Sequence, residues 1–183
     1  MRVRPGTLLI VGLSLLTGIG VASAALAVWT ASSLGSSVDD ADAASAEQAA
    51  ALQLKFRAAD VNGWQTAYGY DQGKSRPQFL ESVKAFRSEE AALKALVGAD
   101  SRAAFDKLSA DFDAFMKLDD QTWQAGSTSG WDGKARDLIL GDNITAFEAV
   151  AADADVLVKA AADDVARASA GAHSTDSRAK LLS

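Results

Sequence analysis

The chain has 183 residues, a formal net charge of −6, one histidine and no cysteine. The lack of cysteine excludes disulfide frameworks, thiol chemistry and cysteine-based zinc sites, and His173 alone gives no basis for a Ser-His-Asp triad. Only two prolines interrupt a sequence that is rich in alanine, leucine and aspartate. Because these residues favour helices and no stretch alternates with period two, we predict an all-α protein.

The first 40 residues have the pattern of a membrane segment. No charged residue occurs from Pro5 to Val38, and the stretch 7–34 exceeds the about 20 apolar residues that cross a bilayer. Arg2 and Arg4 precede it, and acidic residues begin at Asp39. By the positive-inside rule, residues 1–6 are predicted to be cytoplasmic and residues 35–183 extracytoplasmic, with the lipid bilayer around 7–34.

A cleaved signal peptide is the alternative for the same segment. Residues 8–21 would be its apolar region, and Ala22-Ser23-Ala24 resembles a cleavage site. The apolar run continues past this point to Trp29, which is long for a signal peptide and favours the transmembrane helix.

The acidic balance of the remaining chain bears on its partners. Removing Arg2 and Arg4 from the 18 basic residues leaves 16, against 24 acidic residues. Such a surface repels nucleic acid, and no basic stripe offsets it, so we expect neither DNA nor RNA as a partner.

After the membrane segment, turn signals divide the chain into four predicted helices, at about 36–70, 76–97, 101–125 and 132–182. The first break is the turn after Tyr70, where Ser75 and Gln78 have the spacing of a capping box. The stretch GSTSG at 126–130 predicts the last turn. Short turns between long helices favour an up-down-up-down four-helix bundle.

Within each helix, residues at alternating spacings of four and three predict the buried seam. For the first helix this seam is Ser45, Ala49, Leu52, Phe56, Ala59, Gly63, Thr66 and Tyr70. For the second it is Phe79, Val83, Phe86, Glu90, Leu93 and Val97, and for the third Phe105, Leu108, Phe112, Phe115, Asp119 and Thr122. For the fourth it is Leu140, Ile144, Phe147, Ala151, Ala154, Val158, Ala161, Val165 and Ala168.

Aromatic residues concentrate where the first and third predicted helices end. The bundle topology would bring five of them to the membrane-distal end: Trp64, Tyr68, Tyr70, Trp123 and Trp131. They are interpreted either as bulk that fills the end of an alanine-rich core or as the wall of a ligand pocket. The candidate ligand-binding residues are Arg57, Asn62, Trp64, Gln65, Tyr68 and Trp123.

No set of residues suggests catalysis, so we expect neither an enzyme nor a bound cofactor or metal. Acidic pairs occur at Asp119-Asp120, Asp153/Asp155 and Asp163-Asp164. Neighbours one or two apart do not face each other on a helix, so these pairs are interpreted as solvated surface. A divalent cation site is the alternative.

Two stretches carry a family resemblance. LQLKFRAADVNGWQTAY, residues 52–68, resembles the first-helix signature of the four-helix-bundle sensors of bacterial methyl-accepting chemotaxis proteins, and Trp123 in DDQTW is similar to a second aromatic position there. The resemblance implies a homodimeric chemoreceptor in the cell membrane that senses a small molecule or a binding protein outside the cell. It also implies a second membrane helix after this bundle, followed by a HAMP linker and a methylated cytoplasmic hairpin that contacts a kinase.

The chain as given contains one predicted membrane helix and none of those later parts. Two alternatives therefore stay open. The same kind of bundle serves as the sensor region of histidine kinases and cyclases. A tethered or secreted helical bundle with a structural or interaction role is the third hypothesis.

Overall fold

A computed structural model describes the backbone of residues 5–182 and the side chains of residue 36, residues 38–171 and residue 173. Within these limits the chain is helical and has no strand, which confirms the all-α prediction. The elements are α1 (Pro5–Tyr70), α2 (Arg76–Leu96), α3 (Arg102–Ser129), α4 (Lys134–Leu138), the π-helical turn η1 (Ile139–Asn143) and α5 (Ile144–Leu182).

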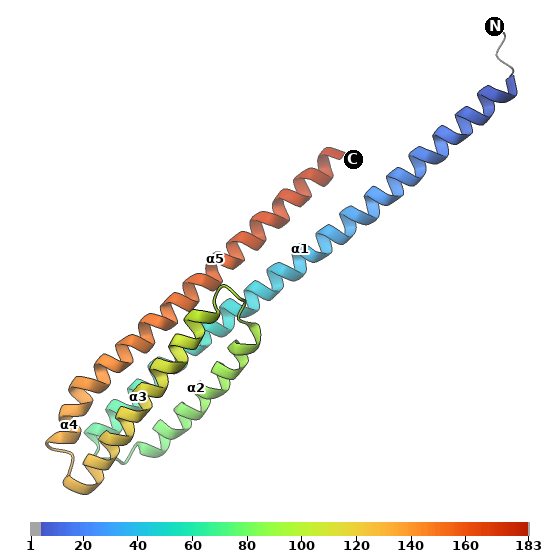
Figure 1. Cartoon of the computed structure of the whole chain (residues 1–183). Helices are drawn as coiled ribbons and strands as arrows, with labels where there is room; N and C mark the ends of the chain where they lie inside the picture. Colours follow the sequence, from blue (N-terminus) through green and yellow to red (C-terminus); the bar gives the residue numbers. More distant parts are fainter. Residues whose placement is uncertain (1–4, 183) are drawn as a thin grey trace. The chain divides into compact units, whose positions relative to one another are not determined.

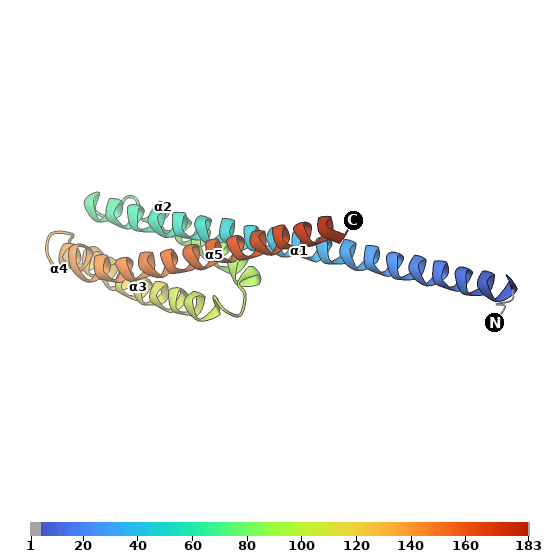
Figure 2. The same cartoon turned by 90° about the horizontal axis from the view of Figure 1, so that it is seen from above.

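The chain divides into two compact units, residues 42–166 and residues 1–41 with 167–183. In the first unit, α2 and α3 pack beside the later part of α1 and the early part of α5, as an antiparallel four-helix bundle (Figures 1 and 2). The predicted transmembrane segment 7–34 lies outside the residues whose side chains are described. Among the described residues, no helix has both the length and the apolar character that a membrane span requires.

Phenylalanines form the centre of the bundle core. The rings of Phe86 on α2 and Phe112 on α3 stack with centroids 3.7 Å apart and planes 13° apart. All four helical segments contribute buried apolar residues, from α1 Ala51, Leu54, Ala58, Val61 and Tyr68, from α2 Phe79, Phe86 and Leu93, from α3 Phe105, Leu108, Phe112 and Phe115, and from α5 Val150, Ala154 and Leu157. The predicted seam of α3 is buried at every position, and that of α2 differs only in burying Ser82 more deeply than Val83.

The predicted seam of α1 is wrong by two residues. Leu52 and Phe56 are 49% and 61% exposed, and Tyr70 is 80% exposed. The buried face instead follows Ala44, Glu47, Ala51, Leu54, Ala58, Val61, Gln65 and Tyr68. Positions on both faces recur at spacings of three and four, and alanine is frequent on each. Periodicity alone therefore could not show which face is buried.

The predicted seam of the last helix is wrong in its first part, at Leu140 and Ile144, and correct further along. Leu140 and Ile144 are exposed, whereas Asn143 and Val150 are buried. The π-helical turn η1 inserts one extra residue and rotates the helix, an effect that a regular heptad count does not contain. The predicted positions Ala154 and Ala161, further along α5, are buried.

Both turns differ in detail from the sequence prediction. The predicted capping box does not form, because the Ser75 hydroxyl and backbone N–H both donate to the Asp71 carboxylate. The hydroxyl contact holds the pKa of Asp71 below its usual value. Helix α3 continues to Ser129 instead of ending near 125, and the next helix begins at Lys134 instead of 132.

Two residues of the acidic pairs that were interpreted as solvated surface are buried, although Asp119 also stood in the predicted seam of α3. Asp119 of α3 is 0% exposed and receives hydrogen bonds from three side chains. Asp153 of α5 is buried too, and Lys107 Nζ on α3 donates to both of its oxygens at 2.8 Å. Burial raises the pKa of Asp153, a change that the Lys107 contact opposes.

Candidate functional site at the aromatic end of the bundle

Four aromatic rings meet where α1 and α3 end, and we call this region the aromatic end: Tyr68, Phe79, Trp123 and Trp131. The Tyr68 ring is the hub, with centroid distances of 5.3 Å to Phe79, 6.0 Å to Trp123 and 5.6 Å to Trp131. All three pairs meet edge to face, an arrangement that aromatic rings favour. The predicted convergence is therefore present for Tyr68, Trp123 and Trp131.

Two glycines allow the indole rings to approach the backbone. At Gly126 a Cβ would lie 2.7 Å from three atoms of the Trp131 ring, so the indole packs directly on α3. Gly73, in the turn between α1 and α2, has a φ of 91° and would place a Cβ 3.0 Å from Trp123 and 3.1 Å from Trp131. Glycine is thus required there both by the left-handed backbone and by the two rings.

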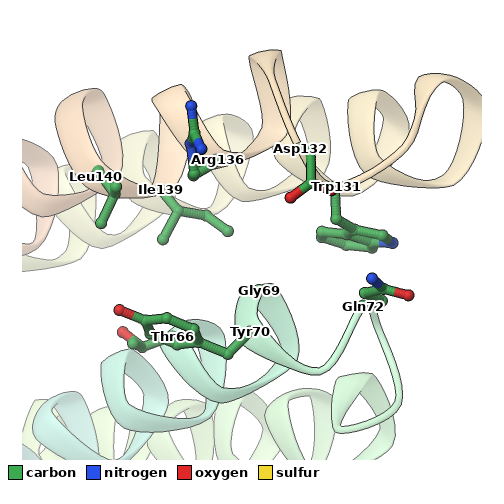
Figure 3. A pocket seen from close by; sticks show the side chains of 9 residues that line it. All are labelled: Thr66, Gly69, Tyr70, Gln72, Trp131, Asp132, Arg136, Ile139 and Leu140. Atoms are coloured by element: carbon green, nitrogen blue, oxygen red, sulfur yellow. The ribbon is translucent and has the colours of Figure 1, made fainter.

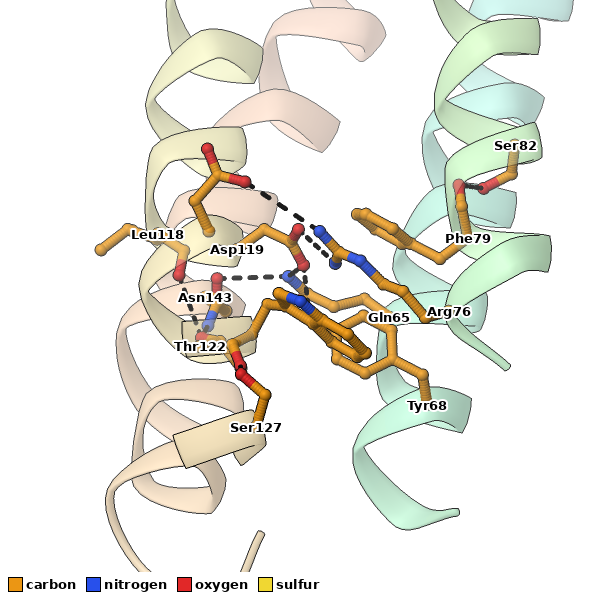
Figure 4. Close-up of polar contacts among 12 residues, drawn as sticks. Gln65, Tyr68, Arg76, Phe79, Ser82, Leu118, Asp119, Thr122, Ser127 and Asn143 are labelled. Carbon is orange, nitrogen blue, oxygen red and sulfur yellow. Dashed lines mark hydrogen bonds and ion pairs between the residues drawn. The ribbon is translucent and has the colours of Figure 1, made fainter. Parts of the chain in front are cut away.

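A buried polar cluster lies beside the rings, centred on the Asp119 carboxylate (Figure 4). Gln65 Nε2 donates to Asp119 Oδ1 at 2.9 Å, and the Tyr68 hydroxyl donates to the same oxygen. Arg76 Nη1, from the first turn of α2, donates to Asp119 Oδ2. Helices α1, α2 and α3 are therefore joined through one carboxylate.

Charge and burial both act on this cluster. The Arg76 guanidinium carbon lies 5.0 Å from the ring centroids of Tyr68 and Trp123 and 4.6 Å from that of Phe79, a cation–π arrangement. Burial, followed by the charge of Asp119, raises the pKa of Tyr68 far above its usual value. Tyr68 consequently keeps its proton and remains a hydrogen-bond donor to Asp119.

The π-helical turn extends the cluster to the last helix. It places Asn143 in the core, where Nδ2 donates to Thr122 Oγ1 at 2.7 Å and Oδ1 accepts from Gln65 Nε2 at 3.3 Å. Thr122 in turn donates to the Leu118 carbonyl at 3.0 Å. Each of these side chains therefore has a hydrogen-bond partner within the cluster or on the backbone beside it.

A pocket of about 260 Å³ opens next to the aromatic end, between the end of α1 and the start of the last helix (Figure 3). We call it the end pocket. Its apolar wall consists of Gly69, Tyr70, Trp131, Ile139 and Leu140. Its polar lining consists of Thr66, Gln72, Asp132 and Arg136.

A second hollow of about 380 Å³ lies between α1 and α2, and we call it the side groove. Arg57, Asp60 and Trp64 line it from α1, and Gln78, Glu81, Ser82 and Ala85 from α2. Arg57 Nε is buried with no hydrogen-bond partner, and its nearest charge is Glu89 Oε1 at 3.9 Å. Arg57 and Asp60 therefore lie in the same groove, and the ion-pair partner of Arg57 is Glu89.

The six predicted ligand-binding residues are distributed over three environments. Gln65 and Tyr68 belong to the buried polar cluster, and Trp123 packs on Tyr68 and Arg76. Arg57 and Trp64 line the side groove. Asn62 is half-buried and lines neither the end pocket nor the side groove. None of the six lines the end pocket.

Sequence reasoning missed the polar residues that define the site. Asp119 and Thr122 stood in the predicted seam of α3, and a charged residue inside an apolar seam is a signal of a buried polar cluster. Arg76, its charge partner, precedes Pro77 at a helix start and gave no such signal. Asn143 required knowledge of the π-helical turn.

Comparison of the chain with protein-family models, curated proteins and solved structures finds no match.

Proposed function

We propose that the chain is the extracytoplasmic sensor module of a transmembrane chemoreceptor of the methyl-accepting kind, and that it passes ligand binding to a cytoplasmic signalling domain beyond this chain. The proposal rests on the uncharged segment 5–38, the resemblance of residues 52–68, and the arrangement of the bundle. Residues 7–34 would form the membrane anchor, with residues 1–6 in the cytoplasm.

One observation carries the proposal furthest. Within residues 42–166 the chain enters and leaves at the same end of the bundle (Figure 1), and Lys55 of α1 forms an ion pair with Asp155 of α5 about halfway along these two segments. The end pocket lies at the opposite end and is bounded by the end of α1, at Tyr70, and by η1, which leads directly into α5, at Leu140. A ligand that favours one packing of these segments would shift the bundle between two states along its length.

The same proposal includes a homodimer. The face of α1 that is not buried in the bundle carries Leu52 and Phe56, both largely exposed, and α5 adds the exposed Val156. A second copy of the chain is the occupant that the family resemblance implies. Changing Phe56 to Glu is expected to convert dimer to monomer in sedimentation velocity, whereas Leu80→Glu, an exposed apolar position on α2, is expected to leave the dimer intact. A dimer that survives Phe56→Glu would reject this interface.

Membrane topology can be measured directly, because the chain contains no cysteine. In intact cells, a membrane-impermeant maleimide is expected to label Ser88→Cys, an exposed position on α2, and to label Val3→Cys only after lysis. Labelling of neither residue before lysis would contradict an extracytoplasmic bundle.

The same labelling experiment separates the proposed anchor from a secreted bundle. If the labelled Ser88→Cys protein is found in the medium with the mass expected after cleavage at Ala24, the tethered sensor is wrong. If the protein instead stays in the membrane, fusing the chain to the signalling half of a methyl-accepting receptor, or to a histidine kinase, would show which output the bundle drives.

A further inference from the structure

The end pocket has a chemical character of its own. Figure 3 shows the Asp132 carboxylate pointing toward the space in front of α1, whereas the Arg136 side chain points away from α1. The charge that faces the pocket is therefore negative. The uncharged polar groups around it are the Gln72 amide and the Thr66 hydroxyl.

Two aromatic side chains bound the pocket from opposite helical segments. Trp131 lies above Gln72 in Figure 3, and Tyr70 lies along α1. Tyr70 is 80% exposed, so most of its ring is available to a bound molecule. Aromatic rings combined with a carboxylate are the groups that recognise alkylammonium ions in proteins, through cation–π attraction and ion pairing.

The pocket is also preformed on one side. Trp131 is held against Gly126 and between the rings of Tyr68 and Trp123, each 5.6 Å from it, so it has little freedom to turn away. The volume of about 260 Å³ is below the about 300–1,000 Å³ of pockets for drug-sized ligands, which limits the occupant to a small molecule.

We propose that the end pocket binds a small alkylammonium ion, with the charged nitrogen beside the Asp132 carboxylate and its alkyl groups against the rings of Trp131 and Tyr70. The inference rests on the proposed sensor function for its biological meaning. The binding step itself requires neither the membrane nor an output domain, so it can be tested separately.

Two probes of the same shape test the role of charge: choline and its uncharged carbon analogue, 3,3-dimethyl-1-butanol. The full chain in detergent is titrated with each, and binding is followed by tryptophan fluorescence and calorimetry. Choline is expected to bind at least about tenfold more tightly than the uncharged analogue. Equal affinity for the two probes, or no saturable choline binding with a Kd below about 10 mM, would overturn the proposal.

Variants of the pocket locate the binding site. Asp132→Asn is expected to weaken choline binding by about 5- to 30-fold, whereas Asp142→Asn, an exposed carboxylate on η1 outside the pocket lining, is expected to leave it unchanged. Tyr70→Leu is expected to weaken binding similarly, and Tyr70→Phe to preserve it. Both residues are exposed, so the variants should fold, which circular dichroism verifies.

The outcomes for the pocket and for the sensor function are distinguishable. Unchanged choline binding in Asp132→Asn, or an equal loss in Asp142→Asn, would refute binding in the end pocket even if the labelling experiment places the bundle outside the cell. Choline binding that Asp132→Asn weakens would support the pocket even if the labelling experiment contradicts the proposed topology.

Discussion

Replacing Asp119 with leucine tests the central contact of the aromatic end. The carboxylate is 0% exposed and accepts hydrogen bonds from Gln65, Tyr68 and Arg76. Removing it leaves the largely buried Arg76 guanidinium with only the exposed Asp120, whose Oδ1 lies 4.0 Å from Nη2, so we expect a cost near the about 3–5 kcal/mol of a broken buried ion pair. The Tyr68 hydroxyl is left unpaired as well, at a cost of about 1–3 kcal/mol. Because these costs overlap, we expect a loss of about 4–6 kcal/mol.

Urea unfolding followed by far-UV circular dichroism measures this loss. For a slope of about 1–3 kcal/mol per molar urea, a loss of 4 kcal/mol lowers the unfolding midpoint by about 2 M. The loss is a large part of the about 5–15 kcal/mol that stabilises a typical domain, so Asp119→Asn provides a milder variant. It removes the charge but keeps one oxygen that can accept from Tyr68, and we expect it to lose less stability than Asp119→Leu.

A double-mutant cycle isolates the ion pair from the other contacts. Arg76→Met alone leaves Asp119 buried without its cation and is expected to cost about 3–5 kcal/mol. The double variant Asp119→Leu/Arg76→Met contains neither buried charge, so it is expected to be more stable than Asp119→Leu alone. If the two single losses simply add in the double variant, the residues are not coupled and the reasoning about the buried pair is wrong.

Two further predictions concern the proton on Tyr68 and the packing of Trp131. Burial and the Asp119 charge raise the Tyr68 pKa in the folded protein, whereas the unfolded chain loses this proton above about pH 10. Stability should therefore fall above pH 10 by about 1.4 kcal/mol per pH unit, and Tyr68→Phe should abolish this contribution. In the variant Tyr70→Phe, Tyr68 is the only tyrosine. When the pH of this variant is raised, tyrosinate absorbance should appear only as the bundle unfolds. Its appearance in the folded state would contradict the burial of Tyr68. Gly126→Ala should displace the Trp131 indole, shift its fluorescence and lower the stability of the bundle by about 1–3 kcal/mol. Gly63→Ala, at an exposed helical site with no neighbour within 4 Å, should raise the stability by about 0.5–1 kcal/mol. Equal effects of the two variants would refute the close packing at Gly126.

The sequence predicted the fold class and the faces of α2 and α3 because large side chains determine them. Phe86 and Phe112 have no polar competitor at their positions, and the seam of α3 is correct along its whole length. The aromatic end was predicted in part, since Tyr68, Trp123 and Trp131 do converge there. The side groove was not predicted, although two of the candidate ligand-binding residues, Arg57 and Trp64, line it.

Prediction failed where the deciding interaction came from another helix or from irregular backbone. The extra residue of the π-helical turn rotates Leu140 out of the core and Asn143 into it. No spacing rule contains that insertion, although π turns occur often at functional sites. The end pocket depends on this turn, because Ile139 and Leu140 form part of its wall. The pocket could therefore not be assembled from regular helices.

The choice of face on α1 has a physical explanation in the polar cluster. The face with Leu52 and Phe56 offers apolar side chains of a size comparable with Leu54 and Val61 on the buried face, so apolar burial alone does not select one face strongly. The face that is buried carries Gln65 and Tyr68, the two α1 side chains that donate to Asp119. Asp119 would lose both donors if α1 turned its other face inward, and an unpaired buried carboxylate is costly.

We infer that the buried cluster selects the register of α1. Asp119→Leu/Arg76→Met removes the feature that distinguishes the two faces, so this variant is expected to keep its helix content while α1 samples both packings. Hydrogen exchange of α1 amides in the bundle should then accelerate relative to those of α3, whose phenylalanine seam is unchanged. Wild-type protection of α1 in the double variant would mean that apolar packing around Leu54 and Val61 fixes the register without the Asp119–Arg76 ion pair. The cluster would then serve another purpose, such as holding Tyr68 and Trp131 beside the end pocket.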